Sequence, residues 1–127
     1  MSAPDLRPLV GCQITQITLD YRVTLLLASQ DGGANPSVSA WLTIGAPFVL
    51  TSDAGATTVD PDTFGNYDRV PQLLGAHVEA AAVEDDLSLV LAFSDGTKLT
   101  SARTPTFESW ELGGRGVRPW IALPGGP

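Results

Sequence analysis

Apolar and polar residues alternate over several short stretches of the chain, as they do in half-buried β-strands. Two groups of four strands are predicted in this way: 12–19, 23–28, 38–44 and 48–51, then 76–83, 87–93, 98–102 and 106–112. No long stretch repeats with the 3.6-residue period of a helix. The one helical candidate is a short turn near 67–74, and Pro71 limits its length.

Two local signals refine this pattern. The apolar parity changes within the first strand, from Ile14 to Ile17, which predicts a β-bulge near residues 15–16. Asp95 and Gly96 lie between two predicted strands, and glycine accepts the positive φ that tight hairpin turns require. We therefore expect a hairpin with its turn at Asp95-Gly96.

Two segments of the chain resemble each other. Residues 9–28 align without a gap on residues 73–92, at an offset of 64 (from Leu9 to Leu73), and Gly11 recurs as Gly75. Because the offset is even, each matched residue faces the same side of its strand. Leucine-rich strands can also look alike by chance, but the ungapped register favours an internal duplication. It predicts two β-meander halves, 9–51 and 73–112, and an acidic linker over 52–70.

These elements predict a single all-β domain over residues 1–127, mainly antiparallel, folded as a sandwich or a flattened barrel. Alternate residues of the second strand in each half should form its core, with the Trp110 indole packed against them. The predicted core residues are Val23, Leu25, Leu27, Leu87, Leu89 and Leu91.

Charge narrows the choice of partner. The chain has 14 acidic residues against 7 lysines and arginines, a net charge of −7, which disfavours nucleic acid and anionic membranes and favours a basic protein. The first residues contain no signal-peptide core, and no apolar run reaches membrane-spanning length. We therefore expect a cytoplasmic protein.

Catalytic and cofactor chemistry find little support in the sequence. Cys12 is the single cysteine, so no intrachain disulfide or multi-cysteine zinc site can form, and Ala76 at the matching position indicates a small buried slot. His77 is the single histidine, and no nucleophile accompanies it. Nucleotide-binding and hydrolase motifs are absent. We expect no cofactor, no metal and no enzymatic activity.

The acidic side chains around Trp110 do not form a catalytic pair. In a regular strand Glu108 and Glu111 lie on opposite faces, which argues against two carboxylates acting together. Trp110 is expected to anchor its strand in the core, as Phe48 does in the first half.

The second half resembles a known family. Gly75-x-x-Val78, the Asp95-Gly96 turn, Phe107-Glu108-x-Trp110 and the late Pro124-Gly125-Gly126 are similar to a bacterial, mostly actinobacterial, family of small proteins of unknown function. Its members carry a Tyr-Glu-Ala-Trp-type motif, in which this chain has Phe107 for the tyrosine. These residues and Gly11, the counterpart of Gly75, are candidate structural residues, and the resemblance supplies no activity. Some similar small β proteins accompany secreted toxins as immunity proteins.

The predicted linker carries the candidate partner-binding residues: Asp53, Asp60, Asp62 and Asp68. The segment from Asp60 to Gly65 begins like an EF-hand loop, but Phe64 and Pro71 stand where calcium ligands are required. The sequence thus favours a non-enzymatic protein that binds a basic partner through an acidic surface, with an immunity-like role as one form of it. A structural homodimer or accessory subunit is the alternative, and a small enzyme using Asp85-Asp86 or Glu108 and Glu111 is a third.

Overall fold

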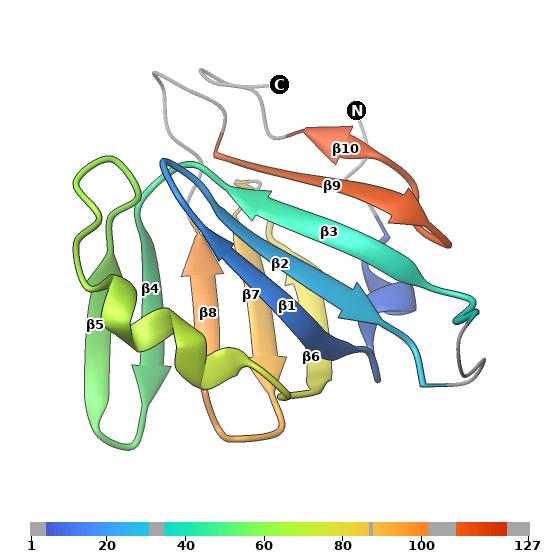
Figure 1. The fold of residues 1–127 in the computed structure, drawn as a ribbon, viewed down its shortest axis with the longest axis horizontal. Helices are drawn as coiled ribbons and strands as arrows, with labels where there is room; N and C mark the ends of the chain where they lie inside the picture. The colour runs from blue at the N-terminus through green and yellow to red at the C-terminus, as the bar shows by residue number, and fades with distance from the viewer. Residues whose placement is uncertain (1–4, 31–34, 87, 102–108, 122–127) are drawn as a thin grey trace.

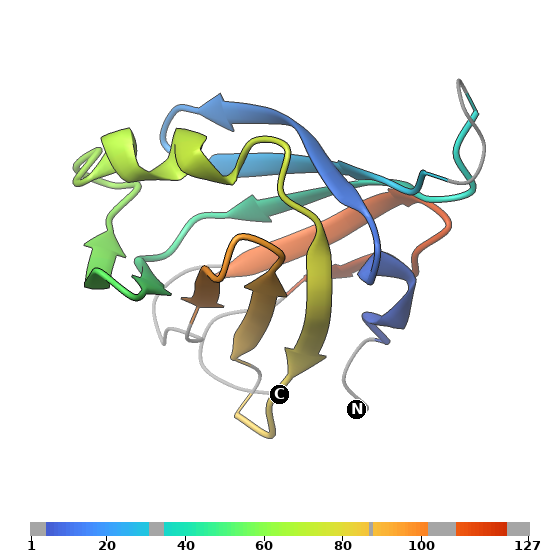
Figure 2. The same cartoon turned by 90° about the horizontal axis from the view of Figure 1, so that it is seen from below.

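The structure is a computed structural model that describes residues 5–30, 35–86, 88–101 and 109–121. Its strands form two five-stranded antiparallel sheets that face each other across one core (Figures 1 and 2). This confirms the predicted all-β sandwich, and within the described residues the sheets do not close into a barrel. The strands are β1 (Gln13–Leu19), β2 (Val23–Ala28), β3 (Ser39–Ile44), β4 (Phe48–Ser52), β5 (Gly55–Val59), β6 (Val78–Val83), β7 (Leu89–Phe93), β8 (Lys98–Ser101), β9 (Trp110–Arg115) and β10 (Trp120–Ile121).

The order of the strands shows that the two halves of the chain are intertwined. One sheet has the order β1-β2-β3-β9-β10 and the other has the order β6-β7-β8-β4-β5, read from its far edge. Each sheet therefore takes three strands from one half of the chain and two from the other. The strand at each position in one sheet has its counterpart five strands away in the chain. The halves are consequently not the separate meanders that the sequence predicted.

Three elements were not predicted. The segment 52–70, expected as a linker, contains strand β5, and the second half ends in a corresponding short strand, β10. The predicted short helix near 67–74 is confirmed as the 3₁₀ helix η2 (Tyr67–Leu73), which contains Pro71. A one-turn 3₁₀ helix, η1 (Arg7–Leu9), precedes β1 and was not predicted. Alternation alone missed β5 because only one of its residues, Val59, is fully buried.

The two halves meet through reciprocal hydrogen bonds next to Gly11 and Gly75, whose φ angles are +89° and +88°. Gly11 N donates to Val78 O at 2.7 Å, and Gly75 N donates to Ile14 O at 2.9 Å. Each of these residues is 64 positions from its counterpart, and Gln13 forms a β-bridge with its own counterpart, His77. This arrangement has the two-fold character that the predicted duplication requires, while the duplication itself stays a prediction about the origin of the chain.

The register of the two hairpins corrects the ungapped alignment. The predicted bulge is present in β1, between Ile14 and Gln16, and recurs in β6 between Val78 and Ala80. Ile14 pairs with Leu27, however, whereas Val78 pairs with Phe93, so the second strands correspond at an offset of 66 (from Leu27 to Phe93). The connection between β6 and β7 is two residues longer than that between β1 and β2. Because the shift is even, the buried positions still match.

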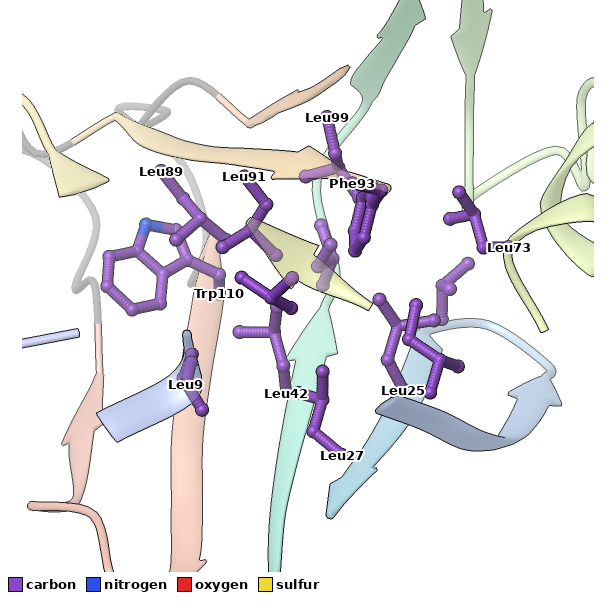
Figure 3. Close-up of a cluster of buried hydrophobic side chains, with 14 of the residues drawn as sticks. Leu9, Leu25, Leu27, Leu42, Leu73, Leu89, Leu91, Phe93, Leu99 and Trp110 are labelled. Carbon is purple, nitrogen blue, oxygen red and sulfur yellow. The ribbon is translucent and has the colours of Figure 1, made fainter. Parts of the chain in front are cut away.

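The core consists of aliphatic and aromatic side chains that point inward from both sheets (Figure 3). Trp110 is 1% exposed and lies beside Leu89 and Leu91, as predicted (Figure 3). Phe48, its counterpart in the other sheet, is equally buried. The remaining predicted core residues, apart from Leu87, are also buried: Val23, Leu25 and Leu27. Leu87 lies outside the described residues.

Candidate functional site

The four candidate aspartates do not form one cluster. Asp53 lies in the β4–β5 turn, whereas Asp60 follows β5 at its other end (Figure 1). Asp62 lies in the loop that connects β5 to η2, and Asp68 lies in the first turn of η2. The structure therefore separates Asp53 from the other three. Asp60 and Asp62 share the loop formed by residues 60–66.

Backbone hydrogen bonds hold this loop in a closed shape. Asp60 and Gly65 exchange two backbone hydrogen bonds, each of 3.0 Å, and Asp60 Oδ1 accepts a third from Asp62 N, also at 3.0 Å. Phe64 and Asn66 have φ angles of +57° and +61°, a conformation that side chains larger than glycine adopt at a cost. Asn66 Nδ2 donates to Thr58 O at 2.8 Å and so ties the loop to β5. These contacts fix the direction in which Phe64 projects.

Three aromatic rings pack together where the loop of residues 60–66 approaches the β1–β2 tip. The Phe64 ring lies 5.0 Å from that of Tyr21, at the β1–β2 tip, and 5.3 Å from that of Tyr67. Tyr67 Oη donates to the backbone oxygens of Asp20 and Pro61, which joins the hairpin tip to the loop. Tyr21 and Phe64 remain 71% and 46% exposed. Sequence reasoning missed both rings, since the only available signal was an aromatic residue in each of two polar turns.

Two carboxylates lie close enough to Tyr67 to act on its hydroxyl. The pKa of Tyr67 is raised above its ordinary value of 10.0, because burial and then the negative charges of Asp20 and Asp60 disfavour its ionised form. Asp20 is at the β1–β2 tip and Asp60 is in the loop, so carboxylates from both segments lie within electrostatic range of the Tyr67 hydroxyl. We call Tyr21, Phe64, Tyr67, Asp20, Asp60 and Asp62 the aromatic corner. Tyr21 and Phe64 are its exposed rings.

One protein-family model matches nearly the whole chain. The model described as "Family of unknown function (DUF6188)" matches residues 5–127. The chain belongs to this family. Neither the comparison with curated proteins nor that with solved structures found a match. Membership in this family agrees with the predicted resemblance to a family of unknown function and supplies no activity for the aromatic corner.

The residues of the family-like motif have structural positions where the structure describes them. Gly96 ends a three-residue hairpin loop with a φ of +90°, and Asp95 Oδ1 accepts a hydrogen bond from Thr97 N at 2.9 Å. Trp110 stacks on Trp120 with 4.9 Å between ring centroids. Phe107 and Glu108 lie outside the described residues.

The remaining candidate groups for chemistry are dispersed. Cys12 is fully buried, as predicted, and its counterpart Ala76 is 8% exposed. His77 lies at the junction between the sheets, where its backbone N donates to Ser94 Oγ. Glu111 forms an ion pair of 3.6 Å with Arg22. Among the residues that the structure describes, no three metal-ligating side chains gather. No helix in the described ranges is long and apolar enough to cross a membrane.

Proposed function

We propose that the protein acts by binding a basic protein partner through the aromatic corner, without catalysis. The observation that supports this most is the exposed pair Tyr21 and Phe64, whose rings are in contact and whose two loops also carry Asp20, Asp60 and Asp62. Partly exposed aromatic residues on rigid backbone are typical anchors of protein interfaces, because they bury large areas with little loss of side-chain entropy. We also propose that this binding takes place in the cytoplasm.

The charges define the kind of partner. A net charge of −7 with carboxylates around the aromatic anchors steers a positively charged surface toward the corner, and such steering raises association rates by roughly tenfold to a thousandfold. A nuclease-type toxin domain with a phosphate-binding cleft has such a surface. An immunity-like role is therefore the specific form of the proposal. An internal duplication, which the reciprocal contacts of Gly11 and Gly75 support, would have supplied the scaffold.

The experiment begins by identifying the partner. Capture from cell extract is run in parallel with the unmodified chain and with the Tyr21→Ala/Phe64→Ala variant, and the protein lost from the variant is purified. Surface plasmon resonance then measures its binding over a salt series. We expect Asp60→Lys/Asp62→Lys to slow association and to flatten the salt dependence, and Phe64→Ala to speed dissociation.

Two further variants make this test selective. Because the Asp60 carboxylate also accepts a hydrogen bond within the loop, Asp62→Lys/Asp68→Lys tests the charge while leaving that bond in place. Glu84→Lys/Asp85→Lys makes the same change in charge at the β6–β7 tip and serves as the matched control. If the corner variants associate at the unmodified rate with the same salt slope, the contact surface lies elsewhere.

A further inference from the structure

A small pocket opens beneath η2, at the end of the sandwich where Asp53 lies. Its volume is about 100 Å³, and its walls come from β4, β5, η2 and the β7–β8 turn. Leu50 and Leu73 form its buried base, and Ala54 and Gly55 contribute to its rim. The polar groups around it are those of Ser52, Thr57, Arg69, Gln72 and Thr97. None of the aromatic-corner residues lines it.

The two halves differ in side-chain size at one position beside this pocket. Thr57 pairs with Leu50 on β4, as Trp120 pairs with Leu112 on β9, so Thr57 and Trp120 hold equivalent places in the two sheets. Trp120 fills its place by stacking on Trp110, with 4.9 Å between ring centroids. Thr57 is far smaller and leaves space between the sheet and η2. The position of Trp120 is thus filled by an indole ring, whereas the equivalent position of Thr57 borders a pocket.

The polar lining favours a negative group. Arg69 carries the positive charge, and none of the residues that line the pocket is acidic. Among the described residues the guanidinium of Arg69 forms no ion pair and no hydrogen bond, whereas those of Arg7 and Arg22 are paired with Asp5 and Glu111. A guanidinium binds a carboxylate through two parallel hydrogen bonds. In this protein of net charge −7, an unpaired arginine beside hydroxyl groups is suited to that contact.

We propose that this pocket binds the carboxylate group of a short aliphatic chain. Arg69 receives the carboxylate, the Thr57 and Thr97 hydroxyls donate to it, and the aliphatic part lies on Leu50 and Leu73. A volume of about 100 Å³ is smaller than that of an engineered cavity of about 150 Å³ that binds benzene, so the pocket accommodates a carboxylate on a short aliphatic chain. Asp53 and Asp68 flank the lining residues in sequence and weaken binding, so we expect dissociation constants on the order of millimolar.

The test is a ¹H–¹⁵N NMR titration of the full chain with butyrate and with its neutral isostere butyramide. We expect butyrate to shift the amide signals of pocket residues in a saturable way, and butyramide to shift them at least tenfold more weakly. Arg69→Gln should weaken butyrate binding at least tenfold. Thr57→Trp, which copies the residue of the other half, should abolish it while Arg69 is retained. Arg118→Gln removes an exposed arginine elsewhere and should change nothing.

Further arms separate the sources of the carboxylate from other anions. N-acetylvalinate imitates the C-terminus of a polypeptide, and tighter binding than butyrate assigns the pocket to chain termini; weaker binding assigns it to free acids. Tighter binding of inorganic phosphate than of either carboxylate overturns the proposal. So does equal binding of butyrate and butyramide, the absence of saturable shifts up to about 50 mM, or unchanged binding by a folded Arg69→Gln variant. The spectrum of each variant without ligand reports whether it is folded.

Discussion

The tips of the β1–β2 and β6–β7 hairpins share one backbone feature. Asp20 Oδ1 accepts a hydrogen bond from Arg22 N at 2.8 Å, and Asp86 Oδ1 accepts one from Ser88 N at 3.0 Å. In both hairpins the residue after this donor begins the returning strand. These two aspartates are 66 positions apart, so the structural counterpart of Asp20 is Asp86, whereas the ungapped sequence alignment paired it with Glu84.

Beyond this shared bond the tips differ. The first tip holds Tyr21 against Phe64 and accepts the Tyr67 hydroxyl, so it is joined to the loop of residues 60–66. The described residues of the second tip expose acidic side chains, including Glu84 and Asp85, and have no aromatic contact. The same hairpin is thus used twice, and the candidate binding surface lies at the tip that contacts another loop.

The largest effect should come from what the two hairpins share, their buried faces. Leu25 and Leu91 are counterparts, and both are 0% exposed. Leu25→Ala and Leu91→Ala should each lower the free energy of unfolding by about 2–5 kcal/mol, as large-to-small changes in a core do. Urea denaturation measures both. A loss below about 0.5 kcal/mol for either variant would place that residue outside the core.

A smaller effect should be confined to the first tip and its loop. Asn66→Ala removes the hydrogen bond to Thr58 O and places alanine at a φ of +61°, so we expect a loss of about 2 kcal/mol in unfolding free energy. Asn66→Gly loses the same hydrogen bond without the conformational cost and should lose about 1 kcal/mol. Thermal and urea denaturation would measure the difference. Equal losses in the two variants would show that the left-handed backbone of Asn66 carries no cost.

The junction glycines should respond equally, since they occupy equivalent places. A Cβ atom at Gly11 or Gly75 meets nothing within 4 Å, so Gly11→Ala and Gly75→Ala bear only the cost of a positive φ, about 1–2 kcal/mol each. Asparagine at either position should cost less, because it tolerates this conformation better. Urea denaturation of the four variants tests the symmetry. Unequal losses for the two alanine variants would break it.

The smallest effect concerns pH. Because the pKa of Tyr67 is raised above 10.0 in the folded chain, its neutral hydroxyl stabilises the fold fully below about pH 10, and this contribution is lost as the pH rises through the folded pKa. Unfolding free energies of the unmodified chain and of Tyr67→Phe, measured from pH 8 to pH 11, should therefore converge at the alkaline end. A constant difference over this range would mean that Tyr67 ionises equally in the folded and unfolded states.

The sequence predicted those parts of the fold that alternation encodes. The bounds of β2 at Val23–Ala28 agree with prediction to the residue, and the bulge in β1 was read from its change of parity. Strand β5 was missed because Gly55–Val59 is largely exposed and has no alternating burial signal. The exchange of strands between the halves was also beyond reach, since each strand's own pattern is compatible with either sheet.

The candidate site was only partly predictable. Asp60 and Asp62 were identified from their density in one segment, and the structure places both in the aromatic corner. Asp20 and Tyr21 fall between the predicted strands 12–19 and 23–28, and nothing in the local sequence indicates that this turn contacts the loop of residues 60–66. The pocket at Arg69 depends on Thr57 and Trp120 holding equivalent places, which becomes visible only when β5 and β10 are placed in their sheets.

The exchange of strands also constrains how the chain can fold during synthesis. Strand β3 pairs with β9, and Leu42 lies opposite Leu112. During synthesis β3 therefore lacks one of its two neighbouring strands until β9 has been made. Strand β4, with β5 paired to its other side, leaves the ribosome before β8, the strand with which it pairs in the folded sheet. Contacts of such sequence separation slow folding, because long loops must close before the contacts form. The nascent first half therefore exposes two unpaired strand edges, and is the stage at which a chaperone has most to cover.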